Sequence, residues 1–380
     1  MSFAASLSSR SADPVLPQIA YDLSVTPTTA TLLATAFAIP YAVMQPVLGA
    51  LADMFGKARL LLLCALILVI AAFISAVATS FPMLFAARVL FGIGTGGVFP
   101  ISVAITGDLV PVHGRQVAIA RMLAASMTGV VLGAAGAGVA GDLIGWRGVF
   151  WLNTFLGAIC FVACAAGLRA MLAEKPEPRG LASVVAGYKS ILRHPLAPVC
   201  FGAVLVEGIC IQGLFPFVSV MLHDQGEERS SIPGLVLAAW GAGGFIYSMM
   251  IVHLLRRFSE RSLMIMGGSL TASSLVVMSF DPRWQIAFAV FLSLGISFYL
   301  LHGVIQLYAS ELSTESRGTA MALHSAFFFF GMASGPVIYA AGFSAIGIMP
   351  TLLLAATAIM AIALICARFL HRSAMRPELG

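Results

Sequence analysis

Long apolar stretches separated by short polar ones run along the whole chain. A helix that crosses the hydrocarbon core of a bilayer needs about 20 mostly apolar residues. Twelve stretches of this kind occur, at 1–21, 28–52, 60–79, 82–108, 116–140, 148–171, 196–222, 233–255, 262–280, 284–310, 318–343 and 347–370. The pattern predicts an all-α integral membrane protein with twelve transmembrane helices.

The longest polar segment divides these helices into two sets of six. The predicted domains are an N-terminal six-helix half (1–171), a cytoplasmic linker (172–194) and a C-terminal six-helix half (195–380). The halves share a spaced pattern, in which Asp108, Arg115, Gly129 and Gly133 recur in order as Glu311, Arg317, Gly331 and Gly335. Two pseudo-symmetric halves with a parallel internal repeat are typical of secondary transporters, whose substrate site lies between the repeats.

The composition supports a membrane location. Hydrophobic residues make up 60% of the chain and charged residues only 10%, whereas soluble domains carry about 25% charged residues. So few charges cannot cover a soluble surface, which excludes a soluble enzyme, a nucleic-acid-binding protein and a disordered scaffold. The net charge of +5 reflects membrane topology and predicts no nucleic-acid partner.

The positions of the basic residues predict the orientation. Of the 21 Lys and Arg residues, 16 fall in segments that are cytoplasmic if the N-terminus lies inside, and three fall in outside loops. Cytoplasmic loops are enriched in Lys and Arg, so we expect both termini in the cytoplasm. The first span lacks the pattern of a signal peptide and is expected to stay in the mature protein.

Four ionisable side chains lie well inside the predicted spans: Arg10, Asp13, Arg88 and Glu207. A charge at this depth costs several kcal/mol, so each is a functional hypothesis. Arg10 and Asp13 are three residues apart and can pair on one helix face. Glu207 has no basic neighbour within a turn, which makes it the better candidate for carrying a proton, unless it pairs with Arg88. The alternative is that these charges only hold helices together.

Polar side chains in the second and tenth spans could line a solute cavity. Tyr299, His302 and Gln306 are spaced to lie on one helix face, and Tyr41 and Gln45 are weaker candidates in the second span. The alternative is that each is a hydrogen-bonded packing residue. The six cysteines lie in apolar stretches without metal-ligand spacing, so they predict no metal site.

The loop after the second span carries the most specific motif. Residues 49–59 read Gly-Ala-Leu-Ala-Asp-Met-Phe-Gly-Lys-Ala-Arg and resemble the signature GxLaDrxGrkxxl of the major facilitator superfamily, with Met54 replacing a basic residue. The resemblance implies a cytoplasmic gate made of Gly49, Asp53, Gly56, Lys57 and Arg59, with Asp108 and Arg115 as neighbours. The alternative is a loop that only fixes topology.

Other motifs extend the resemblance along nearly the whole chain. Asp13-Pro14-x-Leu16-Pro17 is similar to an element of drug:proton antiporters, and Arg88 opens an RxxxGxG motif. Gly129 and Gly133 belong to a segment similar to the antiporter signature GxxxGPxxGG, with Ala134 in place of proline. Their counterparts in the eleventh span are Gly331, Gly335 and Pro336. The alternative for these glycines is ordinary helix packing.

In this family the first, fourth, seventh and tenth helices line the cavity, and these helices carry the four intramembrane charges. The resemblance to the drug:proton antiporter branch implies proton-coupled efflux of small, largely apolar compounds by alternating access. We expect a monomer in a bacterial-type inner membrane that uses the proton gradient and needs no cofactor. The alternatives are a proton-coupled symporter that imports an organic anion, and a non-transporting receptor. An enzyme is not expected, because no catalytic constellation lies at either membrane interface.

Overall fold

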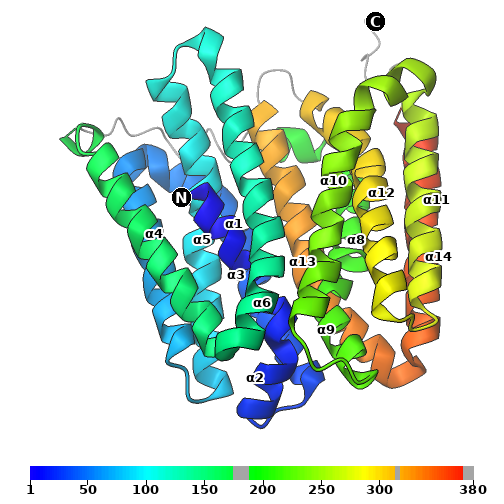
Figure 1. Cartoon of the computed structure of the whole chain (residues 1–380). Coiled ribbons are helices and arrows are strands. Elements are labelled where there is room, and N and C mark those ends of the chain that lie inside the picture. The colour runs from blue at the N-terminus through cyan, green and yellow to red at the C-terminus, as the bar shows by residue number, and fades with distance from the viewer. Residues whose placement is uncertain (174–187, 313–316, 371–380) are drawn as a thin grey trace, which may run out of the picture. The chain divides into compact units, whose positions relative to one another are not determined.

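The structure, a computed structural model, describes residues 1–173, 188–312 and 317–370 (Figure 1). The part described is helical and contains no strand, which confirms the all-α class. Its elements are α1 (Ser2–Ser9), η1 (Asp13–Val15), α2 (Leu16–Asp22), α3 (Pro27–Phe55), α4 (Lys57–Ala76), α5 (Phe81–Leu109), α6 (Val112–Gly167), η2 (Met171–Ala173), α8 (Ala197–Cys210), η3 (Gln212–Leu214), α9 (Phe215–Asp224), α10 (Ser231–Arg257), α11 (Glu260–Met278), α12 (Trp284–Glu311), α13 (Arg317–Ile346) and α14 (Ile348–Phe369).

The number of spans agrees with the hydropathy pattern. Within the described residues, ten helical segments are long and apolar enough to cross a membrane. One of them belongs to α6, which continues over 56 residues and turns at Gly145, whose backbone is non-helical (φ 71°, ψ 171°). Counting α6 twice, and the broken first segment once, brings the ten to the predicted twelve.

The first span is broken, so the prediction of one continuous helix over 1–21 is wrong. The chain leaves the α-helix at Arg10, passes through η1 and continues as α2. Pro14 and Pro17 lack the amide hydrogens that a continuous helix would use. Interrupted backbone at membrane depth is tolerated where protein surrounds it, and Ser11 in the break is fully buried and accepts a hydrogen bond from Asn153.

The seventh span is broken in the same way, because η3 separates α8 from α9. The first and seventh spans occupy corresponding positions in the predicted halves. Helix breaks at matching positions of two repeats are the feature by which transporter binding sites are recognised.

The chain forms two compact units. Unit 1 consists of Met1–Leu181 with Pro216–Ala238, and unit 2 consists of Ala182–Phe215 with Ala239–Gly380. The units differ from the predicted halves in one segment, because 216–238 packs with unit 1. Two hydrogen bonds hold this segment there: the amide of Ser230 donates to the Asp142 carboxylate, and Gln18 donates to the Ser230 hydroxyl.

Glycines bring helix backbones into contact inside each unit. A Cβ atom on Gly133 of α6 would lie 2.1 Å from the carbonyl oxygen of Leu7 in α1, and one on Gly331 of α13 would lie 2.1 Å from that of Leu205 in α8. The glycine motifs at 129–133 and 331–335 therefore pack the broken first and seventh spans against α6 and α13. This close packing fixes the positions of the two breaks, where the buried charges lie.

Candidate functional site

The centre of unit 2 contains a buried acid and a buried histidine in contact. Glu207 lies in the last turn of α8 and is 0% exposed. Its Oε2 atom is 2.8 Å from Nδ1 of His302 on α12. The partner of Glu207 is therefore an imidazole in the tenth span, and one proton between the two atoms can be held by either group.

The surroundings of this pair are aromatic. The ring of Phe298 stacks on His302 at 4.5 Å between centroids, and the rings of His324 and Phe328 lie at 4.9 and 5.2 Å. Among the described residues, two buried atoms near the pair have no hydrogen-bond partner: Oε1 of Glu207 and Nε2 of His324. Unpaired polar atoms inside protein are costly, so these atoms are places where a proton or a polar group of a solute would be stabilised.

Unit 1 contains the second cluster of charges, at the break between α1 and η1. Nη1 of Arg10 lies 3.3 Å from Oδ2 of Asp13, as the spacing predicts, although the two residues do not share a continuous helix. Arg88 of α5 is 1% exposed. It donates to the carbonyl oxygens of Ser9 and Leu33, each at 3.4 Å. With Asp13 ionised, two guanidinium groups and one carboxylate leave this cluster with one net positive charge.

An aromatic ring also covers the Arg88 guanidinium, which lies 5.0 Å from the centroid of Phe37. Tyr41 stacks on Phe37 at 5.4 Å between ring centroids, and Gln45 hydrogen-bonds to the Tyr41 hydroxyl. Tyr41 therefore lies beside a residue that contacts Arg88, and Gln45 lies one contact further away.

The tenth-span candidates do not all reach the Glu207–His302 pair. Tyr299 stacks with Tyr247 at 5.7 Å and lies 5.9 Å from Trp240, so it belongs to the aromatic surroundings. Gln306 is exposed, unlike His302. Residues that share a face of α12 by their spacing thus extend from the buried interior, at His302, to the surface, at Gln306.

The loop motif brings together two of the residues predicted to form a gate. Nζ of Lys57 lies 2.7 Å from Oδ2 of Asp108, which joins the start of α4 to the end of α5. Gly56 has a φ of +93° that allows α3 to end and α4 to begin without an intervening loop. Arg59 donates to the carbonyl oxygen of Leu172. The side chains predicted at Asp53 and Arg115, and the surroundings of Gly49, lie outside the described residues.

Three residues that contact the polar groups of units 1 and 2 were not predicted from the sequence: His324, Gln18 and Asp142. His324 could have been noticed, because it is an ionisable residue within the predicted span 318–343. Gln18 and Asp142 gave no signal, because a glutamine and an aspartate near the ends of spans are common. Across 1–173, 188–312 and 317–370, no group of three or more His, Cys, Asp or Glu residues could hold a metal ion.

Comparisons with known proteins agree with this architecture. A family model described as the Major Facilitator Superfamily matches residues 1–253. Multidrug resistance protein 1 of Bacillus subtilis (strain 168) is 25% identical over 329 residues, which cover 86% of this chain and 83% of that protein. Quinolone resistance protein NorA of Staphylococcus aureus (strain MRSA252) is 25% identical over 342 residues, covering 87% and 84%.

Solved structures show the same fold at lower sequence identity. A POT family transporter in complex with 5-aminolevulinic acid superposes with a TM-score of 0.75 at 14% identity, covering 97% of this chain and 94% of that one. The human organic anion transporter MFSD10 (TETRAN) gives a TM-score of 0.69 at 15% identity, covering 96% and 97%. These matches and the helical architecture identify an integral membrane transporter rather than an enzyme: the chain belongs to the major facilitator superfamily.

Proposed function

We propose that this protein exports small organic compounds in exchange for protons by alternating access. The relatives named for multidrug and quinolone resistance support export of drug-like compounds. The observation that carries the proposal is the contact between Glu207, which is 0% exposed, and His302, two ionisable side chains beside a helix break.

The chemistry of the pair suits an exchange of proton for solute. A carboxylate buried among aromatic rings is unfavourable unless a proton or a positive group neutralises it. A proton on Glu207 and a polar or cationic group of a solute near Oε1 therefore compete for the same charge. Because each stabilises a different charge state of the site, binding of one shifts the protein away from the state that holds the other.

The cluster of Arg10, Asp13 and Arg88 is the corresponding group at the break of the first span. Asp13 has a guanidinium partner 3.3 Å away, whereas the partner of Glu207 is a histidine that can itself lose its proton. Glu207 is therefore the main proton carrier in this scheme, and Asp13 is the second candidate.

The remaining features of the proposal follow from the sequence pattern. The bias of Lys and Arg supports two cytoplasmic termini in a bacterial plasma membrane. The halves 1–171 and 195–380 would rock about the linker 172–194. The proton gradient supplies the energy without a cofactor, and the protein acts as a monomer with no nucleic-acid partner.

Proton flux into proteoliposomes tests the assignment. Wild-type protein should alkalinise the lumen when a hydrophobic organic cation such as tetraphenylphosphonium moves into it down an imposed gradient, because protons leave in exchange. Glu207→Gln should abolish this coupled flux, and Asp13→Asn should reduce it. Asp224→Asn removes an exposed carboxylate at the end of α9 and is the control. Unchanged coupling in both Glu207→Gln and Asp13→Asn would refute the proposal.

Import of an organic anion is the second candidate, and the net positive charge of the Arg10–Asp13–Arg88 cluster favours it. Carboxylates and phosphates bind well to buried guanidinium groups. Thermal stabilisation of the purified protein by a panel of organic anions, but not by hydrophobic cations, would support import over export.

A further inference from the structure

A polar contact in unit 1 joins the end of the fifth span to the start of α10. The carboxylate of Asp142 accepts two backbone hydrogen bonds, at 2.6 Å from the amide of Ser230 and 3.0 Å from the amide of Ser231. These residues begin α10, whose first amides have no partner inside the helix. Asp142 thus supplies from another helix the acceptor that an N-cap side chain usually provides.

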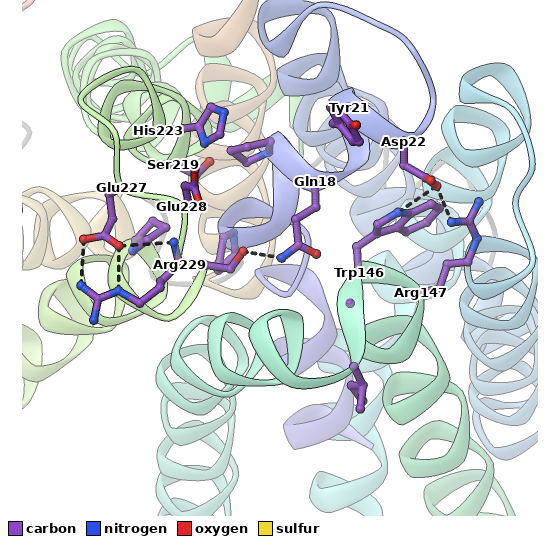
Figure 2. A pocket seen from close by; sticks show the side chains of 16 residues that line it. Gln18, Tyr21, Asp22, Trp146, Arg147, Ser219, His223, Glu227, Glu228 and Arg229 are labelled. Carbon is purple, nitrogen blue, oxygen red and sulfur yellow. Dashed lines mark hydrogen bonds and ion pairs between the residues drawn. The ribbon is translucent and has the colours of Figure 1, made fainter.

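Gln18 adds a third segment to this contact. From α2, its Nε2 atom donates to the carbonyl oxygen of Gly141 at 3.1 Å and to the hydroxyl of Ser230 at 2.9 Å. Figure 2 shows the Gln18 side chain reaching away from its helix toward its partner. We call Gln18, Asp142, Ser230 and Ser231 the latch.

Close backbone packing accompanies the latch. A Cβ atom on Gly138 would lie 2.5 Å from the carbonyl oxygen of Ser230, and one on Gly234 would lie 2.6 Å from that of Ala134. No side chain separates the start of α10 from α6 at these positions. Ser230 is only 5% exposed, whereas Asp142 is exposed and Gln18 and Ser231 are half-buried, so the latch lies at the solvent-facing edge of this packed contact.

A pocket of about 680 Å³ lies at this end of unit 1 and includes Gln18 and Ser230 in its lining. Two ion pairs hold residues of its wall, Arg147 with Asp22 and Arg229 with Glu227 (Figure 2). Buried residues lie next to the latch on the other side: Val15 is 0% exposed, and a Cβ atom on Gly141 would contact its side chain at 2.5 Å. Pro14 of η1 also lines the pocket, so the latch lies beside the break of the first span, where Val15 is buried.

We propose that the latch is the outer gate of the transporter, which closes the side of unit 1 that faces away from the cytoplasm. Gln18 and Asp142 belong to the predicted N-terminal half, and Ser230 and Ser231 belong to the predicted C-terminal half. Alternating access requires these segments to separate when the protein opens outward. The proposal rests on alternating access and on the predicted orientation, but not on proton transfer through Glu207.

The partners of Asp142 are backbone amides, so only the acceptor side of this contact can be removed by substitution. An N-cap acceptor contributes about 1 kcal/mol, which corresponds to about a fivefold change in an equilibrium. Asp142→Ala should therefore raise the population of outward-open protein about fivefold. Asp142→Asn keeps one acceptor oxygen and should have a smaller effect.

Labelling of intact cells with a membrane-impermeant maleimide measures this population. Val15→Cys reports opening, because Val15 is fully buried against Gly141 next to the latch. Tyr21→Cys, at a residue that is 91% exposed, reports orientation. The native chain, which has six cysteines, gives the background. Asp142→Ala should increase labelling of Val15→Cys about fivefold, and Glu228→Gln should leave it unchanged, because Glu228 lines the same pocket without bonding to Ser230 or Ser231.

Two outcomes would overturn the proposal: equal labelling of Val15→Cys in Asp142→Ala and Glu228→Gln, or no labelling of Tyr21→Cys from outside. A double variant tests the gate by covalent closure. The end of the Gln18 side chain meets that of Ser230 at 2.9 Å, and cysteine is shorter than glutamine, so Gln18→Cys with Ser230→Cys should be bridged by a short bifunctional methanethiosulfonate. Transport should stop on cross-linking and return on reduction, and continued transport by the cross-linked protein would contradict the gate.

Discussion

The glycines of α6 allow a matched test of the packing that positions the first span. A Cβ atom on Gly133 would lie 2.1 Å from the carbonyl oxygen and 2.8 Å from the carbonyl carbon of Leu7, both backbone atoms. Contacts between carbon and a carbonyl oxygen are about 3.3–3.6 Å. Gly133→Ala therefore forces α1 and α6 apart by about 1 Å, because neither backbone can rotate away.

The expected loss of stability in Gly133→Ala follows from a comparison with Gly136→Ala, at a glycine three residues along the same helix. A Cβ atom there has nothing within 4 Å. Alanine is favoured over glycine inside a helix by about 1 kcal/mol, and this gain is common to both substitutions. The difference between them is the overpacking at Gly133, about 1–3 kcal/mol.

Thermal unfolding of the purified protein in detergent measures this difference. One kcal/mol shifts Tm by about 2–4 °C in a unit of roughly 200 residues, so a difference of about 1–3 kcal/mol should make Gly133→Ala melt about 2–12 °C below Gly136→Ala. Gly331→Ala and Gly202→Ala form a second matched pair, because Gly331 contacts the Leu205 carbonyl and Gly202 has nothing near it. Equal melting temperatures within both pairs would refute the reasoning.

Three further predictions concern the ion pairs and the histidine. Asp108→Asn and Lys57→Met each break the contact between α4 and α5, so each should slow transport by a similar factor, and the double variant should be no slower than either alone in a substrate-efflux assay. Hydrogen bonds from Arg229 hold the pKa of Glu227 below its ordinary value. The stabilisation is therefore present above that ordinary value and is lost as pH falls through the lowered pKa, so the Tm difference between wild type and Glu227→Gln should vanish on acidification. His302→Gln keeps a hydrogen-bonding side chain but cannot take up a proton, so it should shift the pH optimum of transport, and an unchanged pH profile would exclude a proton role for the histidine.

The sequence predicts the helices well, because the apolar length needed to cross a bilayer leaves few alternatives. The breaks in the first and seventh spans were not predicted. In the first span, Pro14 lies in η1 and Pro17 follows at the start of α2. In the seventh span, Pro216 follows η3 (Gln212–Leu214) and cannot donate to the carbonyl oxygen of Gln212 as a continuous helix requires, and Gly213 packs against Gly335 of α13 at the break.

The sequence predicted which charged residues belong to the candidate site, but it did not predict which side chains pair with them. Glu207 and His302 were singled out separately, since 95 residues separate them in the chain and hydropathy carries no information on which helices touch. Asp142 was missed for a related reason: its partners are backbone amides, which every residue except proline possesses. Contacts of this kind depend on tertiary structure alone.

Proton release on solute binding tests the central claim most directly. Purified protein in weakly buffered detergent solution, with a pH-indicator dye, is mixed with tetraphenylphosphonium. If Glu207 and His302 exchange a proton for solute, wild-type protein releases protons on binding, and Glu207→Gln binds the cation without releasing any. Equal proton release by wild type and Glu207→Gln would contradict the account.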